Sequence, residues 1–175
     1  MRDPVDSERV QAFLRELGKS VRTPTTVYLS GGTSAVLVGW RDTTVDVDLK
    51  FVPDTEVFGI LPRLKESLRV NVELASPDHF LPPLPGWQER SVFITRIDSL
   101  ECRHYDFYSQ ALSKIERGFS QDLDDVREMV RRGLVDPEKL VRFAREILPE
   151  LPRYPAVDER SFLDAVEKFV RSLDD

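Results

Sequence analysis

The chain has 175 residues, of which 41% are hydrophobic and 32% are charged, and its formal net charge is −6 at pH 7. This length supports one substantial core, and the negative charge excludes a global positive field that would hold a long nucleic acid, while a local basic patch or a small anionic ligand stays compatible with it. The single cysteine, Cys102, excludes a disulfide framework and a thiolate-rich zinc site. The charged N-terminus carries no apolar signal segment, and no stretch approaches the roughly 20 apolar residues of a membrane span, so we expect a cytoplasmic protein with no membrane partner.

The first half of the chain predicts helices and strands in alternation. An amphipathic helix is expected to begin with Asp3 as its N-cap and to end at Gly18. The β-branched and aromatic run 25–29 predicts a strand, and the small apolar residues 33–38 predict a buried helix that follows a glycine pair. The remaining elements are expected to be a strand over 45–51, a helix over 57–68, a strand over 70–74 and two short strands over 91–96 and 101–105.

Proline and helical periodicity characterise the rest of the chain. Segment 76–87 contains four prolines and predicts an ordered, extended loop that could wall a pocket. Apolar residues at helical spacing predict helices over 109–117, 123–131, 137–148 and 158–173, the third with Asp136 as its N-cap. We therefore expect an α/β (α+β) fold with a small mixed sheet and flanking helices. Its core would span residues 1–106 and its helical C-terminal part residues 107–175, packed together as one compact domain.

Two aspartates lie on the second predicted strand. Asp46 and Asp48 alternate with apolar residues, so both carboxylates project from one face of the strand while the apolar side chains anchor the other face. Glu73 adds a third acid on the following strand. Carboxylate oxygens are hard ligands that suit Mg²⁺, although a pair of alternating aspartates is also the pattern of an ordinary exposed strand face.

A glycine turn precedes these acids. Leu29-Ser30-Gly31-Gly32 ends an apolar strand and opens a helix, where glycine backbone can approach a phosphate closely and helix N-terminal amides can receive it. We expect Gly31, Gly32 and Thr33 to hold phosphate. A phosphate cradle beside paired carboxylates indicates phosphoryl transfer with two Mg²⁺ ions, or Mn²⁺, in which the metals activate a hydroxyl and stabilise leaving pyrophosphate.

Charged residues in the helical part allow two interpretations. Lys114 and Arg117 share a helix face and could reach triphosphate oxygens together, or they could form a solvated charged surface. Asp122 and Asp125 also share a face, at a helix start, where capping is the simpler explanation.

Histidines and loop aromatics are weaker candidates. His79 and His104 lack partners at metal-ligand spacing and are interpreted as structural, as is Cys102 on a buried strand. Loop aromatics usually cover a core, but three of them could instead stack on a base: Trp40, Phe80 and Trp87.

The spacing of the glycines and aspartates resembles a known signature. Gly31-Gly32, thirteen residues, and then Asp46-Val47-Asp48-Leu49 is similar to the signature of the polymerase-beta-type nucleotidyltransferase superfamily. The resemblance implies that the glycine motif opens a helix, that Asp46 and Asp48 bind metal, and that a third carboxylate lies on a following strand. Glu73 matches that third position, and Asp106 is its rival.

Further motifs resemble the AbiEii-like group, which includes bacterial toxin nucleotidyltransferases of toxin–antitoxin and phage-defence systems. The match covers residues 27–132. It implies that Arg41 and Lys114 neutralise the triphosphate, and that Asp122 orients Lys114 or acts as a base. The residues that carry the likeness are Arg41 with Thr44, Lys114-Ile115-Glu116-Arg117, and Asp122 with Asp125.

We therefore expect a metal-dependent nucleotidyltransferase that moves a nucleoside monophosphate from a nucleoside triphosphate to an acceptor hydroxyl. The resemblance implies that the acceptor is a transfer-RNA end or a protein, and that a toxin or antitoxin is a partner. Two alternatives stay open. The first is a non-catalytic nucleotide-binding or antitoxin-like regulatory protein with the same fold. The second is a metal-dependent nuclease, which leaves the glycine turn unexplained.

Overall fold

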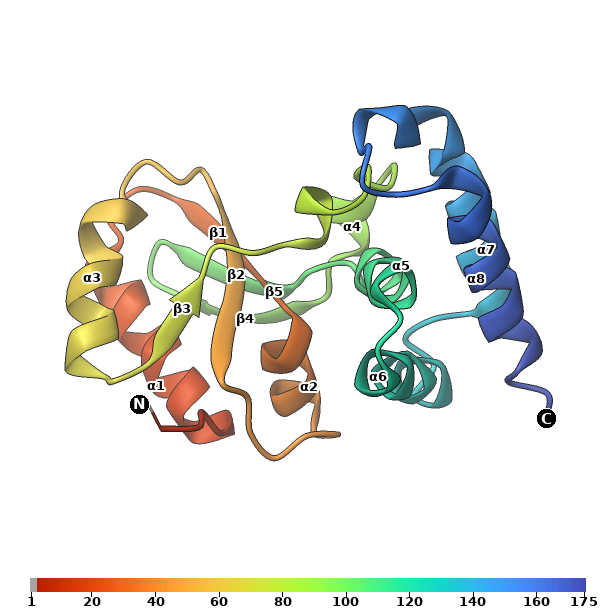
Figure 1. The fold of residues 1–175 in the computed structure, drawn as a ribbon. Coiled ribbons are helices and arrows are strands. Elements are labelled where there is room, and N and C mark those ends of the chain that lie inside the picture. The colour runs from red at the N-terminus through yellow and green to blue at the C-terminus, as the bar shows by residue number, and fades with distance from the viewer. Residues whose placement is uncertain (1–2) are drawn as a thin grey trace. The chain divides into compact units, whose positions relative to one another are not determined.

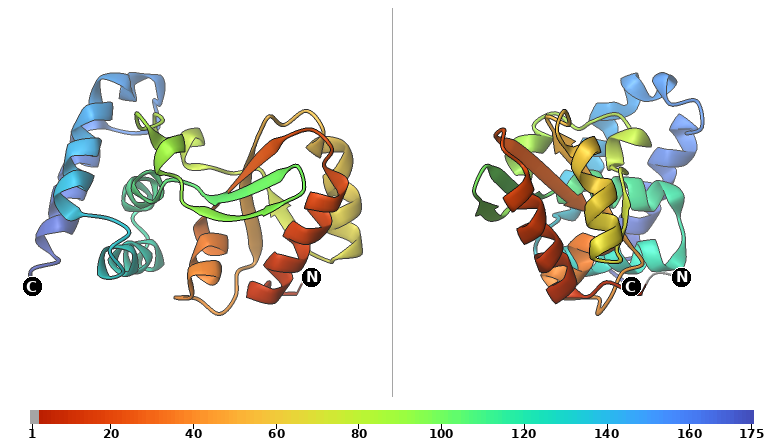
Figure 2. Two further views of the ribbon diagram at one scale, coloured as in Figure 1. Left: turned by 180° about the vertical axis from the view of Figure 1, so that it is seen from behind. Right: turned by 90° about the vertical axis from the view of Figure 1, so that its left-hand side faces the viewer.

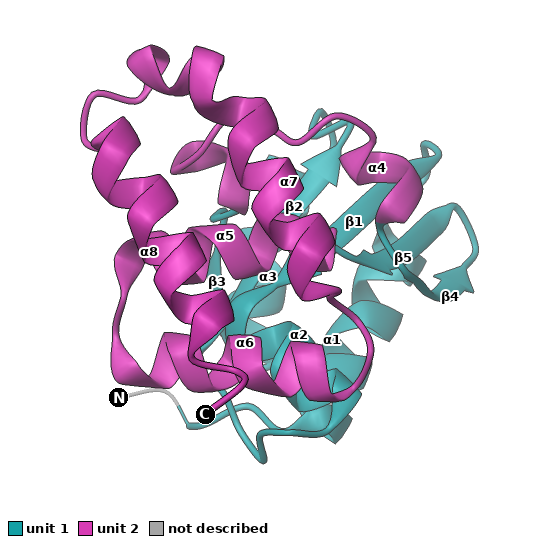
Figure 3. Cartoon of the chain, turned by 90° about the vertical axis from the view of Figure 1, so that its right-hand side faces the viewer, with its two compact units in different colours: residues 1–76, 91–105 teal, residues 77–90, 106–175 magenta. Residues whose placement is uncertain are grey.

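The computed structural model describes residues 3–175, which form two compact units (Figure 1, Figure 3). Unit 1 runs to Ser76 and resumes over Ser91–Tyr105, and unit 2 consists of Pro77–Arg90 and Asp106–Asp175. The proline-rich segment thus belongs to the helical unit, whereas the sequence placed it with the sheet. No helix within the described residues is long and apolar enough to cross a membrane.

Unit 1 contains a five-stranded mixed sheet in the order β3-β2-β1-β5-β4. β1 lies at its centre, antiparallel to β2 and parallel to β5. β3 joins β2 in parallel, and β4 and β5 form an antiparallel hairpin. The predicted fold class is confirmed. The strands are β1 Thr25–Ser30, β2 Asp46–Val52, β3 Asn71–Glu73, β4 Phe93–Ile97 and β5 Leu100–His104.

One face of this sheet is covered by two helices, α1 Ser7–Ser20 and α3 Val57–Ser67, which lie side by side (Figure 2). Their buried apolar side chains pack with those of the strands into the core of unit 1. β2 contributes Val47 and Leu49 to this core, so the alternation of the strand turns Asp46 and Asp48 to the opposite face. We call this opposite face the polar face. Its other residues are Lys50, two positions after Asp48 on β2, and the strand neighbours of the aspartates, Ser30, Asn71 and Glu73.

The first helix differs from its prediction at both ends. Its N-cap is Asp6, whose side chain accepts a hydrogen bond from the Arg9 amide, and not Asp3. Gly18 lies inside the helix instead of at its end, and a Cβ at this position would collide with the side chain of Ile97. Close packing of the helix on β4 therefore requires the glycine, which local propensity interprets as a helix stop.

Val45 also departs from the predicted pattern. It was expected on the apolar face of the second strand, but β2 begins one residue later and Val45 is 71% exposed. The short helix α2 Gly31–Val38 follows β1 as predicted and ends at Gly39 in the left-handed conformation.

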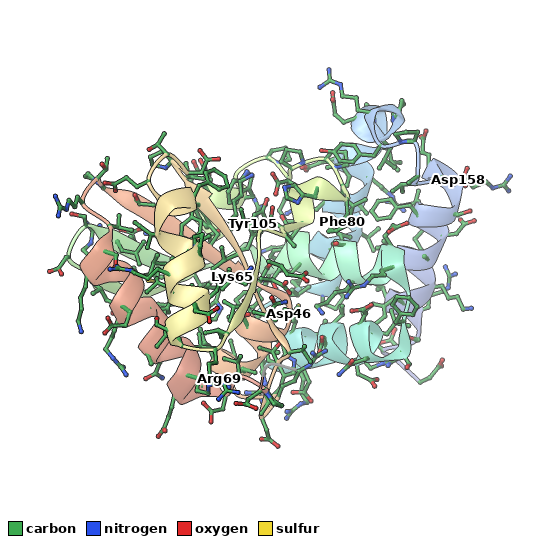
Figure 4. The ribbon with its side chains drawn as sticks, turned by 60° about the vertical axis from the view of Figure 1, so that its left-hand side comes forward. Asp46, Lys65, Arg69, Phe80, Tyr105 and Asp158 are labelled. Carbon is green, nitrogen blue, oxygen red and sulfur yellow. The ribbon has the colours of Figure 1, made fainter. Side chains whose placement is uncertain are left out.

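Unit 2 is helical throughout. The side chain of Asp136 caps α7, as the sequence predicted. Asp158, labelled in Figure 4, was expected as the first residue of the last helix and is instead the N-cap of α8. Asp106 caps α5. The elements of unit 2 are η1 Pro77–His79, α4 Trp87–Arg90, α5 Phe107–Arg117, α6 Ser120–Arg131, α7 Pro137–Ile147, η2 Leu148–Arg153 and α8 Glu159–Arg171.

Candidate functional site

The two aspartates of β2 lie at the centre of the candidate site in unit 1. Asp46 and Asp48 are half-buried and lie on either side of the fully buried Val47 (Figure 4 labels Asp46). Because the intervening valine anchors the strand in the core, both carboxylates are held on the polar face.

The glycine turn lies directly against these acids. Ser30, the last residue of β1, pairs with Asp48, so the chain enters α2 beside the second carboxylate. Gly31 has a φ of +58°, and a Cβ at this residue would lie 2.6 Å from Oδ2 of Asp48. At Gly32 a Cβ would collide with Oγ1 of Thr44 and lie 3.4 Å from a guanidinium nitrogen of Arg41. A side chain would therefore displace the carboxylate at the first glycine and the threonine at the second.

Two threonines fix the backbone that carries the aspartates. Thr33 is fully buried and its hydroxyl accepts a hydrogen bond from the Asp48 amide at 3.2 Å. The hydroxyl of Thr44 donates to the Asp46 carbonyl at 3.0 Å, and that of Thr33 donates to the same oxygen at 3.4 Å. The predicted phosphate contact of Thr33 would therefore use its backbone N–H, because its side chain is engaged with β2.

β3 brings two further polar side chains to the same face. Asp48 is in register with Glu73, and Asp46 is in register with Asn71. Glu73 is exposed, and the amide of Asn71 donates a short hydrogen bond to Oδ1 of Asp46. The third acid thus comes to lie on the strand next to the aspartates, as predicted.

Sequence reasoning did not assign a role to two residues of the polar face. Lys50 follows Asp48 by two residues on β2 and is paired in register with Tyr28, so it projects to the side of the aspartates. Asn71 is the second. The period-two alternation that identified Asp46 and Asp48 applies equally to Lys50 and, on β3, to Asn71 beside Glu73.

The polar face offers two of the oxygen ligands that Mg²⁺ requires, and the remaining ligands would have to come from substrate and water. Within residues 3–175, no three side chains of His, Cys, Asp or Glu are grouped so that they could hold a metal ion by themselves. Mg²⁺ is commonly bound by one or two carboxylates together with substrate phosphates and water. Asp46 and Asp48 supply two such carboxylates, beside a turn whose two glycines carry no side chain.

Unit 2 contains a buried cluster that joins α5 and α6. Nζ of Lys114, which is 6% exposed, lies 2.7 Å from Oδ2 of Asp125 and 3.4 Å from Oδ1 of Asp122. Arg117 binds both oxygens of Asp122 through Nε and a terminal nitrogen. Lys114 is therefore not part of a solvated surface, and the acids do more than cap a helix.

The electrostatics of the cluster favour ionised Asp122. Burial raises the pKa of Asp122, but the hydrogen bond from Arg117 and the charges of Lys114 and Arg117 outweigh it, so the pKa is lowered below its ordinary value. The resemblance predicts that Asp122 orients Lys114, and the two side chains do lie within ion-pair distance.

Asp106, the rival third acid, is held by other groups in unit 2. It is fully buried, caps α5, and accepts two hydrogen bonds from Arg90, at 3.1 and 2.8 Å. The hydroxyl of Ser109 donates to it at 2.7 Å. These contacts account for Asp106 as a structural residue.

The histidine of β5 and the single cysteine are buried. Burial lowers the pKa of His104 to about 4, and its Nδ1 lies 3.0 Å from the hydroxyl of Ser34. Burial, with a smaller contribution from Glu101, raises the pKa of Cys102 to about 12. The burial of both residues agrees with their interpretation as structural.

The loop aromatics are not deeply buried. Phe80, labelled in Figure 4, is 51% exposed and lies edge-on to the exposed His79. Trp87 opens α4, and both it and Trp40 are half-buried. Their expected role in stacking on a base stays a prediction.

Comparison with known proteins adds one finding. A family model described as "Nucleotidyltransferase of unknown function (DUF6036)" matches residues 8–170. Comparisons with curated proteins and with solved structures gave no match.

Proposed function

We propose that this chain, which belongs to the DUF6036 family of nucleotidyltransferases, transfers a nucleoside monophosphate from a nucleoside triphosphate to an acceptor hydroxyl with Mg²⁺ or Mn²⁺ as cofactor. The observation that supports this proposal best is the approach of Gly31 to the Asp48 carboxylate, with Asp46 on the same face. This arrangement combines a glycine turn at a helix N-terminus, which a phosphate can approach closely, with a pair of metal ligands.

Each residue of the polar face then has a role. Asp46 and Asp48 hold the cation, which when bound neutralises charge on the triphosphate and the leaving pyrophosphate. The backbone N–H groups of Gly31–Thr33 receive phosphate oxygens at the N-terminus of α2. Arg41, whose guanidinium lies beside Gly32, adds positive charge to this cradle.

Glu73 has two roles in this proposal. It either completes the metal ligands together with Asp46 and Asp48, or it accepts the proton of the acceptor hydroxyl. Its position in register with Asp48 and its exposure support the second role. The first role requires its side chain to move toward the aspartates, because the three carboxylates are not grouped as a metal site in residues 3–175. If Glu73→Gln leaves triphosphate binding, Mn²⁺ binding and turnover unchanged, Glu73 has neither role.

The proposal also includes the buried cluster of unit 2. Lys114 and Arg117 bind the triphosphate, and Asp122 orients Lys114 or acts as a base. Their charges are already paired with one another. A triphosphate would therefore compete with Asp122 and Asp125 for these cations.

The acceptor and the biological setting come from the resemblance to AbiEii-like toxins. By that likeness, the acceptor is a transfer-RNA end or a protein hydroxyl in the cytoplasm, and the chain works with a toxin or antitoxin partner. The partner is sought among the products of neighbouring genes, by a binding assay and by growth of cells that express the chain with and without each product. Growth unaffected by expression of the chain contradicts a toxin role.

The transfer reaction is tested with labelled triphosphates, Mg²⁺, and total transfer RNA or lysate. Asp46→Asn and Asp48→Asn keep the side-chain volume but remove a charged ligand, so label transfer should fall by about 100-fold or more. The matched control is Asp54→Asn, an exposed aspartate just beyond β2. Transfer that persists in both site variants would rule out the mechanism.

The same experiment separates the alternatives. A non-catalytic binder would retain the triphosphate without transferring label, and its binding would still depend on Asp46 and Asp48. A nuclease would shorten the RNA without incorporating label.

A further inference from the structure

Asn71 is the only asparagine of the chain, and its side chain contacts the first aspartate of the site. It is the first residue of β3, and the parallel register sets it directly beside Asp46. Its Nδ2 donates to Oδ1 of Asp46. Within residues 3–175, this is the one hydrogen bond that the Asp46 carboxylate makes.

The contacts around Asp46 fall into two groups with different effects. Thr33 and Thr44 donate to its main-chain oxygen and therefore fix the strand. Asn71 donates to a carboxylate oxygen and therefore fixes the side-chain torsion of a residue on the half-exposed polar face. Because the core packing of β3 is supplied by the buried Val72, the Asn71 side chain is not needed to fill the interior.

We infer that Asn71 is a positioning residue that holds Oδ1 of Asp46 so that Oδ2 is presented to a divalent cation. The inference rests on the proposed function. A ligand held by a neighbouring donor loses less conformational freedom when a metal binds, and outer-shell partners of this kind commonly contribute about 10- to 100-fold in metal affinity.

The chemistry of an amide suits this position better than that of a carboxylate. The amide supplies a neutral donor, whereas a second carboxylate at the same place would accept only and would repel Asp46. Asn71→Asp, which has nearly the same volume, should therefore weaken cation binding near neutral pH instead of adding a useful ligand.

Binding of Mn²⁺, measured by calorimetry and by electron paramagnetic resonance between pH 5 and 8, tests the inference. In Asn71→Ala the dissociation constant for Mn²⁺ should rise by about 10-fold or more, with an unchanged number of sites. In Asn71→Asp the dissociation constant should rise as well, because the carboxylate cannot donate to Oδ1 of Asp46 and repels it.

Gln11 provides matched controls on the exposed surface of α1. Gln11→Ala and Gln11→Glu make the same chemical changes away from the polar face and should leave both readouts at wild-type values. If Asn71→Ala does not fold, as judged by thermal unfolding, Asn71→Asp carries the test because it preserves the side-chain shape.

Two outcomes would overturn the inference: unchanged Mn²⁺ binding in Asn71→Ala, or tighter Mn²⁺ binding across the pH range in Asn71→Asp. Asp46→Asn, measured in parallel, separates this failure from that of the proposed function. If Asp46→Asn abolishes Mn²⁺ binding while Asn71→Ala does not change it, only the positioning role fails. If neither variant changes binding, the assignment of the metal site to Asp46 is wrong, and the proposed function fails with it.

Discussion

Gly31 and Gly32 occupy positions at which a side chain would disturb the site. The positive φ of Gly31 strains any other residue, and its missing Cβ makes room for the carboxylate of Asp48. Gly39, at the other end of α2, also has a positive φ, but a Cβ there would meet nothing within 4 Å. Gly31 and Gly39 therefore both adopt a left-handed backbone, but only at Gly31 would a side chain also collide with a neighbouring residue.

This difference predicts separate outcomes for Gly31→Ala and Gly39→Ala. Both should lose about 1 kcal/mol of stability from backbone strain. Only Gly31→Ala should also displace Asp48, and a shift of about 1 Å in a ligand can reduce turnover by about 100-fold. Thermal unfolding and label transfer, measured on both variants, check the prediction. Equal transfer by the two variants would show that the approach of Gly31 to Asp48 has no functional role.

His104 predicts a pH dependence of stability. Its pKa of about 4 in the folded protein lies below the value of about 6.5 for an unfolded histidine, so protonation favours the unfolded chain. Its contribution to the free energy of unfolding is therefore fully present above pH 6.5. It should be lost as the pH falls toward 4, by about 3 kcal/mol in total.

Denaturant unfolding between pH 4 and 7 measures this contribution. His104→Gln should show a shallower pH dependence than the wild type across this range, because the titrating group is gone. His79→Gln, which removes the exposed histidine, should retain the wild-type slope. Identical slopes in all three proteins would refute the assignment.

At the scale of elements, α5 and α6 are joined by charges and not only by apolar packing. The pattern Lys114–Arg117 and Asp122–Asp125 placed each pair on a helix face from sequence alone. Which acid each cation binds depends on the turn between the helices, where Gly118 adopts a left-handed conformation. The buried Lys114 lies between two acids, so it stabilises the helix pair whatever its role toward a ligand.

Removal of Lys114 should therefore destabilise the protein. Lys114→Met keeps the apolar stem but leaves Asp122 and Asp125 without the shared ammonium, at a cost of about 3 kcal/mol. The loss should shrink as the pH is lowered, since protonation neutralises the carboxylates left behind. Lys168→Met, an exposed lysine on α8, is the control. Unfolding free energies near those of the control would show that the ion pairs are dispensable.

At the scale of the whole molecule, unit 2 is discontinuous in sequence. Segment 77–90 precedes the β4–β5 hairpin in the chain but belongs to the helical unit. Arg90 links this segment to the rest of unit 2, because it binds the fully buried Asp106 and its guanidinium lies 4.3 Å from the ring centroid of Phe143 on α7. Tyr154 adds a second link by donating to the carbonyl of Asp78 at 3.0 Å.

Arg90→Leu should accordingly destabilise unit 2 by about 3 kcal/mol or more, because it leaves the carboxylate of Asp106 buried without its cation. Hydrogen exchange should accelerate at the start of α5, which Asp106 caps. The control Arg96→Leu breaks an exposed pair with Glu101 on the β4–β5 hairpin and should cost less than about 1 kcal/mol. Equal losses would contradict the linking role of Arg90.

The sequence by itself determined the elements, because the periodicity of apolar residues and the chemistry of caps are local. It identified β2 with its two aspartates, the turn at Gly31, and the cap at Asp136. It misjudged Asp3 and Gly18, where a competing cap and the packing against Ile97 decided the outcome.

Only the tertiary structure decided which distant side chains meet. The register of β3 on β2 brings Asn71 to Asp46 and Glu73 to Asp48, and strand pairing of this kind depends on contacts between segments far apart in the chain. Likewise, the sequence assigned the third acid to Glu73 and left Asp106 as its rival. Burial and the contact with Arg90 separate them, because a carboxylate held by a buried ion pair and a helix cap already has its partners.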